Sequence, residues 1–216
     1  MTGTPNPHAC VVLAIDAARV SGWAVLHGGG ANVVVVESGI AKSANDRYDA
    51  VEAATDTARA LGFKVIAMIE KWSSHGRRGT ANVQRGLGSA AGRWLEQIEA
   101  AGIPKRRILR AKPETWRAAV LSMRTGGRSR VTGDACRAAA IARVRMQFGI
   151  VCGPDQAEAL CLGVFAMHSA EAAKVLPKPR RTRLVTERDA SATTVTVGKA
   201  STCDVVHLGK EWSAKQ

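Results

Sequence analysis

The sequence predicts an α/β fold in which a mixed five-stranded sheet carries helices on both faces. Short apolar runs separated by turn residues indicate three early strands, at 10–15, 21–27 and 33–38. The apolar period then changes to that of helices, which alternate with two further strands at 65–69 and 107–111. Strands that alternate with helices in this way form a sheet with helices packed against it.

The first three strands are expected to form an antiparallel meander, because only short connections separate them. Three consecutive glycines at 28–30 provide a hairpin turn. Asp134 stands where it could cap a helix that runs to about residue 148. The apolar stripes place Trp23, Trp94 and Trp116 in the core. Helical periodicity is found in five segments, namely 46–61, 83–98, 113–121, 134–148 and 154–170.

The domain organisation expected for the 216 residues is one folded domain at 1–170 and a basic, partly flexible C-terminal tail at 171–216. The composition shifts after residue 174, where the sequence LPKPRRTRL is broken by prolines and rich in positive charge. The remainder is rich in serine and threonine. This stretch is therefore interpreted as a tail or arm without a core of its own.

The charge balance points to a polyanionic partner. The formal net charge is +13 and the pI is about 10.2, which makes nucleic acid the first candidate, although some soluble proteins are simply basic. The five cysteines contain no C-x-x-C pair, so a zinc ribbon is not expected. Their odd number and lack of framework spacing predict a reducing, cytoplasmic location. The apolar runs are too short for a membrane span, and no signal peptide is expected.

Four acidic residues stand at positions where acids need an explanation. Asp16 and Glu70 each end an apolar strand, and Asp155 and Glu158 lie three apart at the start of an apolar helix, so that they share one face. The alternative for the first two is that each strand simply reaches solvent there. The alternative for the second pair is a capping-box-like helix start, since acids also favour the first turn.

A common chemistry would unite these acids. Phosphodiester hydrolysis with two metal ions needs hard oxygen ligands around ions about 3.5–4 Å apart. Clustered carboxylates repel one another unless cations lie among them. A small acidic cluster on a basic protein therefore suggests a metal site within a DNA-binding surface.

Three segments resemble the RuvC resolvases of the RNase H-like superfamily, including their divergent phage and prophage members. AIDAARVSGWAVL resembles the first strand, catalytic Asp and second strand; MIEKW resembles the fourth strand with its catalytic Glu; and GPDQAEALCLG resembles the final helix with its acidic pair. The resemblance covers roughly residues 11–168. It departs from the family in the turn at 17–19 and in ending the acidic pair with Glu rather than Asp.

The resemblance implies an RNase H-like nuclease domain and a Holliday-junction resolvase. Its metal ligands and catalytic residues would be Asp16, Glu70, Asp155 and Glu158, which would bind two Mg²⁺ ions per active site, with Mn²⁺ as a possible substitute. It implies a homodimer as well, which suits paired cuts in a two-fold symmetric junction. The partner would be branched DNA such as a four-way junction.

Three basic clusters are expected to contact DNA. They are Lys71 with Arg77 and Arg78, then Arg107 with Arg110 and Lys112, and finally Arg128 with Arg130. Trp72, in the first cluster, would stack on an unpaired base at the junction, or else be a core residue at a strand end. Solvated surface charge is the simpler alternative for each cluster.

The same sequence features are compatible with other functions. The same fold could cut an RNA–DNA hybrid or a flap, or could bind DNA without cutting it. A phosphotransferase of the actin and sugar-kinase kind shares a first strand that ends in Asp, but it needs two such domains and glycine-rich phosphate loops, and the chain has neither the length nor a P-loop.

Overall fold

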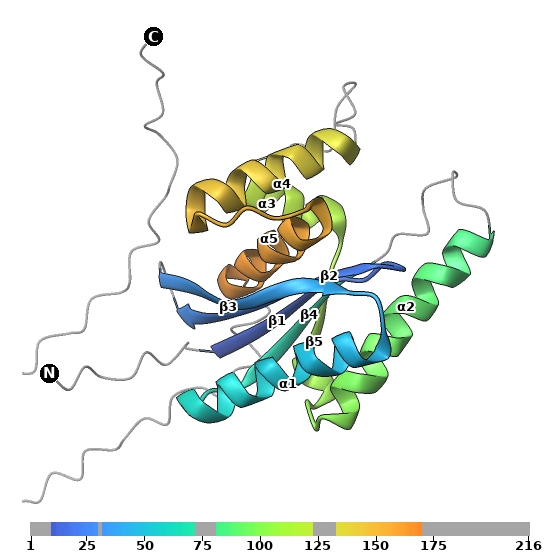
Figure 1. Cartoon of the computed structure of the whole chain (residues 1–216), viewed down its shortest axis with the longest axis vertical. Coiled ribbons are helices and arrows are strands. Elements are labelled where there is room, and N and C mark those ends of the chain that lie inside the picture. The colour runs from blue at the N-terminus through green and yellow to red at the C-terminus, as the bar shows by residue number, and fades with distance from the viewer. Residues whose placement is uncertain (1–9, 30–31, 72–80, 123–132, 170–216) are drawn as a thin grey trace, which may run out of the picture. The chain divides into compact units, whose positions relative to one another are not determined.

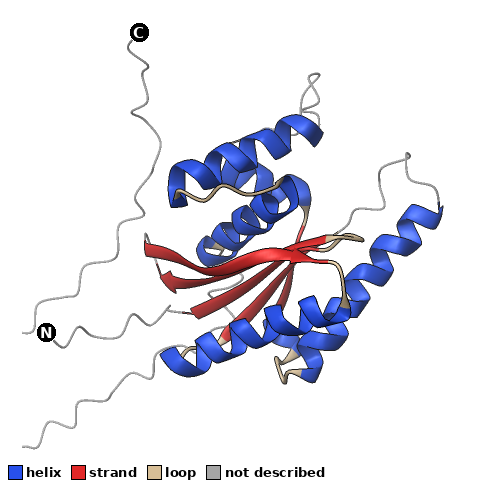
Figure 2. Ribbon diagram, viewed as in Figure 1, coloured by secondary structure: helices blue, strands red, loops and turns tan. Residues whose placement is uncertain are grey.

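The computed structural model describes residues 10–29, 32–71, 81–122 and 133–169. Five strands form one sheet in the order β3-β2-β1-β4-β5 (Figures 1 and 2). The strands are β1 (Cys10–Asp16), β2 (Ser21–Gly29), β3 (Asn32–Ala41), β4 (Val65–Glu70) and β5 (Ile108–Ala111). The predicted tail at 171–216 lies outside the described residues, so the domain organisation stays a prediction.

The sheet is mixed, as predicted. β1 pairs with β2 and β2 pairs with β3 in antiparallel register, which confirms the meander, whereas β1, β4 and β5 run parallel to one another. The register places Ile15 beside Ile69 and Asp16 opposite Gly22. The carboxyl ends of β1 and β4 therefore meet at one edge of the sheet.

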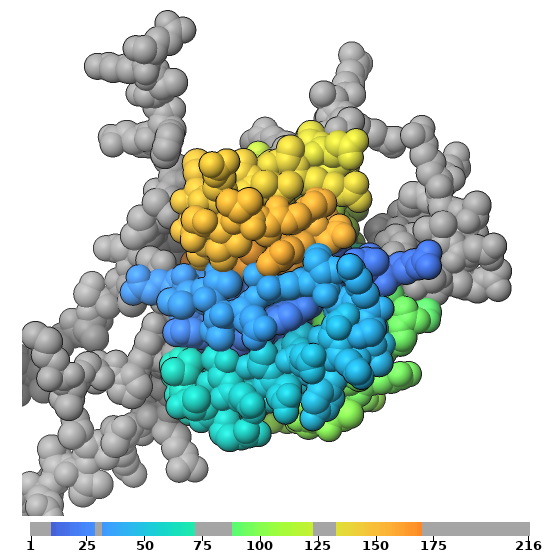
Figure 3. Space-filling view, viewed as in Figure 1, coloured from blue at the N-terminus to red at the C-terminus, as the bar shows by residue number. Residues whose placement is uncertain are grey.

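Helices cover both faces of the sheet, which gives the three layers visible in Figure 3. The helices α1 (Ala44–Leu61) and α2 (Ala81–Ala100) pack on one face. The other face carries α3 (Pro113–Leu121), α4 (Gly133–Phe148) and α5 (Pro154–His168). A short 3₁₀ helix, η1 (Lys105–Arg107), precedes β5. The predicted α/β class, with its RNase H-like arrangement of strands and helices, is the class observed.

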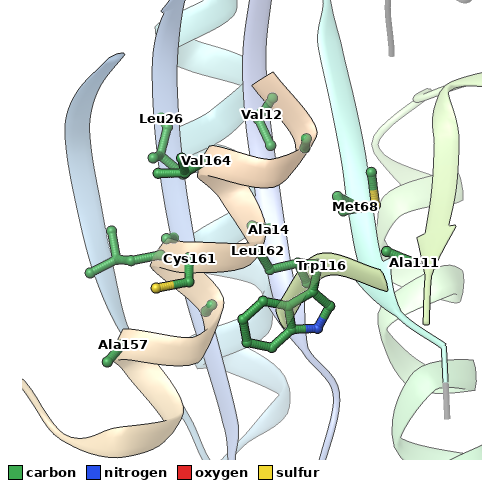
Figure 4. Close-up of a cluster of buried hydrophobic side chains, with 14 of the residues drawn as sticks. Val12, Ala14, Leu26, Met68, Ala111, Trp116, Ala157, Cys161, Leu162 and Val164 are labelled. Atoms are coloured by element: carbon green, nitrogen blue, oxygen red, sulfur yellow. The ribbon is translucent and has the colours of Figure 1, made fainter. Parts of the chain in front are cut away.

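Side chains of the central strand β1 point alternately into two separate hydrophobic cores, one on each face of the sheet. Val11, Leu13 and Ile15 pack toward α1 and α2, whereas Val12 and Ala14 pack toward α5. Figure 4 shows this second core, in which side chains of α5 lie directly over β1 and β2. Because α5 is buried over most of its length, its position relative to the sheet is tightly constrained.

The three predicted core tryptophans are all buried. Trp94 also donates a hydrogen bond of 3.1 Å from Nε1 to the hydroxyl of Ser21, which ties α2 to β2. Asp134 does not cap α4. The helix begins one residue earlier, and Asp134 lies within its first turn with its carboxylate 3.5 Å from Arg137. None of the described helices combines the length and apolar character required to cross a membrane.

Candidate metal centre

The sheet topology brings together acids that are distant in the sequence. Asp16 is the last residue of β1 and Glu70 is the last residue of β4, and these strands are parallel neighbours. The start of α5 lies over Gly22, which is the β2 partner of Asp16. A side chain at Gly22 would overlap the backbone carbonyl of Asp155, so glycine permits this close approach.

The four carboxylates form one cluster. Asp16, Asp155 and Glu158 each offer an oxygen atom, and these atoms lie within 4.8 Å of one another. Glu70 belongs to the same group, because its carboxylate lies close enough to Asp16 to raise the pKa of that side chain.

The simpler explanations account for only part of this cluster. The side chain of Glu70 is only 12% exposed and that of Glu158 only 6%, so neither marks a strand or helix that reaches solvent. The N-cap of α5 is Gly153, which makes no side-chain capping bond, so Asp155 and Glu158 do not form a capping box. Asp155 does lie in the first turn of α5, where the helix dipole favours an acid, but the buried Glu158 lies beyond that turn.

Burial is the main cause of the raised pKa of Asp16, which lies well above its usual range. The neighbouring Glu70 carboxylate, which can accept a hydrogen bond from protonated Asp16, and the charges of Glu70, Glu158 and Asp155 raise this pKa further. Burial also raises the pKa of Glu158, while the positive charge of Arg117 opposes that shift. The cluster is therefore short of positive charge, and its hard oxygen donors suit a divalent cation such as Mg²⁺ or Mn²⁺.

Two residues of α3 contact the cluster, and neither was predicted to be part of it. Trp116 donates a hydrogen bond of 3.2 Å from Nε1 to Oε1 of Glu70, in addition to filling the core. Arg117 places Nη2 2.8 Å from Oε1 of Glu158 and 3.6 Å from Oε1 of Glu70. One clue was available in the sequence: α3 follows β5 directly, so its first turns had to lie beside the end of β4.

Three of the predicted DNA contacts line one surface pocket. Lys71, Arg110 and Lys112 surround it, together with residues of α3 and the end of α5, and its volume is about 570 Å³. All three cationic residues are exposed. Lys71 directly follows Glu70 in the sequence, but none of the four acids lines the pocket.

The other predicted DNA contacts are not brought to this pocket. Arg107 lies at the start of β5, whereas Arg110 and Lys112 lie at its end, so the second basic cluster is divided along the strand. The remaining predicted contacts fall outside the described residues. They are Trp72, Arg77, Arg78, Arg128 and Arg130.

The fold matches a solved resolvase structure along nearly its whole length. The structure titled T. thermophilus RuvC in complex with Holliday junction substrate aligns with a TM-score of 0.54 at 16% identity, covering 76% of this chain and 96% of that chain. The chain has the RuvC fold. A second Thermus thermophilus RuvC structure aligns with a TM-score of 0.49 at 19% identity, covering 78% of this chain and 98% of that chain.

The match to RuvC is one of structure. No family model matches the sequence, and no curated protein matches it. A Ppx/GppA family member from Aquifex aeolicus aligns at 12% identity with a TM-score of 0.31, covering 53% of this chain and 39% of that chain. The RuvC fold explains the order of strands and helices, while the chemistry has to be argued from the residues of this chain.

Proposed function

We propose that this protein is a metal-dependent endonuclease that cuts branched DNA, with the four-way junction as its substrate. The observation that carries the proposal is the partly buried cluster of Asp16, Glu70, Asp155 and Glu158, assembled from β1, β4 and α5. It occurs on a fold like that of RuvC, which has been solved with a Holliday junction substrate. Three basic residues line a pocket that includes Lys71, the residue after Glu70.

The four carboxylates would hold two divalent ions, Mg²⁺ or Mn²⁺. Such ions, when bound, activate a water molecule for attack and stabilise the leaving 3′ oxygen. The chain's own residues do the positioning. Buried packing of α5 fixes the backbone of Asp155 and Glu158, and Trp116 orients Glu70 through its indole N–H. Because the pKa of Asp16 is raised in the cluster, binding of a cation would favour the ionised form of this side chain.

Basic side chains would bind the DNA backbone around this centre. Lys71, Arg110 and Lys112 offer three positive charges around one pocket, a size and charge that suit a phosphate and its neighbouring sugar. Trp72 would stack on a base unpaired at the crossover. We further propose a homodimer, because a two-fold symmetric junction needs two active sites for paired cuts.

A cleavage panel tests the proposed function. Synthetic four-way junctions, flaps, RNA–DNA hybrids and linear duplexes are incubated with the protein in Mg²⁺, and the products are mapped. We expect paired nicks near the crossover of the junction and little cutting of the other substrates. If flaps or RNA–DNA hybrids are cut in preference to junctions, the preferred one is the substrate and the four-way junction is not.

Two variants separate catalysis from binding. Asp16→Asn should abolish cutting and leave junction binding largely intact, because it removes a ligand and leaves the basic surface in place. Asp49→Asn is the matched control, since Asp49 is an exposed acid on α1, on the opposite face of the sheet. Binding by the wild type without any metal-dependent cutting would favour a DNA-binding protein that lacks catalysis.

A further inference from the structure

Arg117 is a cation within the proposed metal centre. Its guanidinium forms an ion pair of 2.8 Å with Glu158 and lies 3.6 Å from Glu70. The three side chains are 23%, 6% and 12% exposed, respectively, so this is not a screened surface pair. It joins acids from α5 and β4 to a residue on α3.

The surroundings of Arg117 show what holds it there. The guanidinium carbon lies 5.1 Å from the centre of the Trp116 ring, and Trp116 binds the same oxygen of Glu70 that faces Arg117. Within the described part of the chain, the buried Nε of Arg117 has no hydrogen-bond partner. A buried N–H without a partner is unfavourable. The attraction of the carboxylates therefore outweighs incomplete hydrogen bonding.

We infer that Arg117 is an internal counter-ion, which neutralises the acidic cluster in the metal-free protein and competes with the divalent cation for Glu158 and Glu70. This inference rests on the proposed metal centre. A guanidinium and a divalent ion that share one carboxylate repel each other, and this repulsion is weakly screened where water is scarce. Arg117 would thus weaken metal binding while it protects the fold from carboxylate repulsion.

The arrangement has a consequence for the loaded site. Arg117 must give up part of its contact with Glu158 when a cation binds, and its guanidinium is then free to contact an anion. In a DNA complex that anion would be the phosphate that the bound cations attract to this centre. The competition therefore couples filling of the site to exposure of a positive charge toward the substrate.

Mn²⁺ binding, measured from the electron paramagnetic resonance signal of free Mn²⁺, tests the inference on the full chain without DNA. A charge within about 4–6 Å shifts an ionisation equilibrium by about one to three units, so Arg117→Met should tighten Mn²⁺ binding by roughly tenfold or more. Arg117→Lys should stay near the wild type. Arg59→Met is the matched control, because Arg59 is an exposed arginine on α1, on the opposite face of the sheet, and pairs with Asp56.

Thermal unfolding gives the second readout. Without metal, Arg117→Met should melt below the wild type, and added Mn²⁺ should raise its melting temperature by more than it raises that of the wild type. If Arg117→Met is too unstable to titrate, Arg117→Gln, which keeps a hydrogen-bond donor but no charge, decides the question.

The outcomes are distinct. The inference is supported if Arg117→Met and Arg117→Gln bind Mn²⁺ more tightly than the wild type while Arg117→Lys and the control do not. Unchanged or weaker binding by the two neutral variants overturns it, because Arg117 would then be indifferent to the cation or would help to hold its ligands. If neither the wild type nor any variant binds Mn²⁺, the metal centre itself is wrong, and the inference about Arg117 falls with it.

Discussion

Gly22 sets how closely the start of α5 approaches β2. A substitution of Gly22 should therefore move Asp155 and Glu158 while leaving both side chains chemically unchanged. A Cβ atom at this position would overlap the carbonyl group of Asp155 and lie 2.9 Å from the backbone nitrogen of Gln156. These are backbone atoms, which cannot swing aside as the end of a side chain can. Gly22→Ala should therefore push the first turn of α5 away from the sheet.

The size of this shift follows from the contacts. Ordinary Cβ contacts begin at 3.4 Å, so Gln156 alone requires a retreat of 0.5 Å from its 2.9 Å position, and the overlap with Asp155 requires more. We expect a displacement of about 1 Å at the two acids, and misplacement of reacting groups by that much can cost on the order of 10²-fold in rate. Overpacking should also cost about 1–3 kcal/mol of stability.

Junction cleavage in Mg²⁺, Mn²⁺ affinity and thermal unfolding should be measured side by side for this variant. Gly163→Ala is the matched control, because Gly163 lies in the same interface of α5 but its added Cβ would meet chiefly the side chain of Leu26. Both variants should lose stability, whereas only Gly22→Ala should lose about two orders of magnitude in cleavage. Equal cleavage by the two variants, at temperatures where both are folded, would refute the idea that Gly22 sets the position of the acids.

Three further predictions concern other parts of the site. Asp16→Asn should make the metal-free protein more stable than the wild type at pH 8, as judged by melting temperature. Since the pKa of Asp16 is raised in the folded state, the ionised side chain destabilises the fold. The gain in melting temperature should therefore shrink as the pH falls toward about 3.9, the pKa of Asp in an unfolded chain. A gain that grows at low pH would contradict this. Trp116→Phe keeps the buried ring but removes the bond to Glu70, so it should cost about 1–3 kcal/mol in urea unfolding and slow cleavage, and full activity would exclude an orienting role. Lys71→Gln and Lys112→Gln should each reduce the slope of log affinity against log salt by about 1, and unchanged slopes would remove them from the DNA surface.

Much of the fold could be predicted from the sequence because its strands and helices have distinct apolar periods. β1 and β4 are uninterrupted apolar runs, which are typical of strands buried on both faces. The helix α5 shows no division into an apolar and a polar face, because it is buried almost all round. The boundary of α4 was misjudged by one residue. Asp134 was a plausible cap in sequence, but its carboxylate turns instead toward Arg137 within the first turn.

The acids of the site were predictable because each one interrupts an apolar pattern, and burial makes such an acid unusual. Trp116 and Arg117 were not, because a tryptophan on an apolar stripe and an arginine beside it are ordinary features of an amphipathic helix. Their role depends on where α3 lies in three dimensions, and no periodicity carries that information. The second basic cluster was divided for the same reason, since Arg107 ends η1 before β5 begins, whereas Arg110 lies near the end of that strand.

The central claim is that acids from three separate elements form one metal centre, and anomalous diffraction from crystals soaked in Mn²⁺ tests it most directly. We expect anomalous density bounded by the carboxylates of Asp16, Asp155 and Glu158, with Glu70 completing the site, and loss of that density in Asp16→Asn. Anomalous density only at unrelated surface carboxylates, or none at all in a soaked crystal of the wild type, would contradict it.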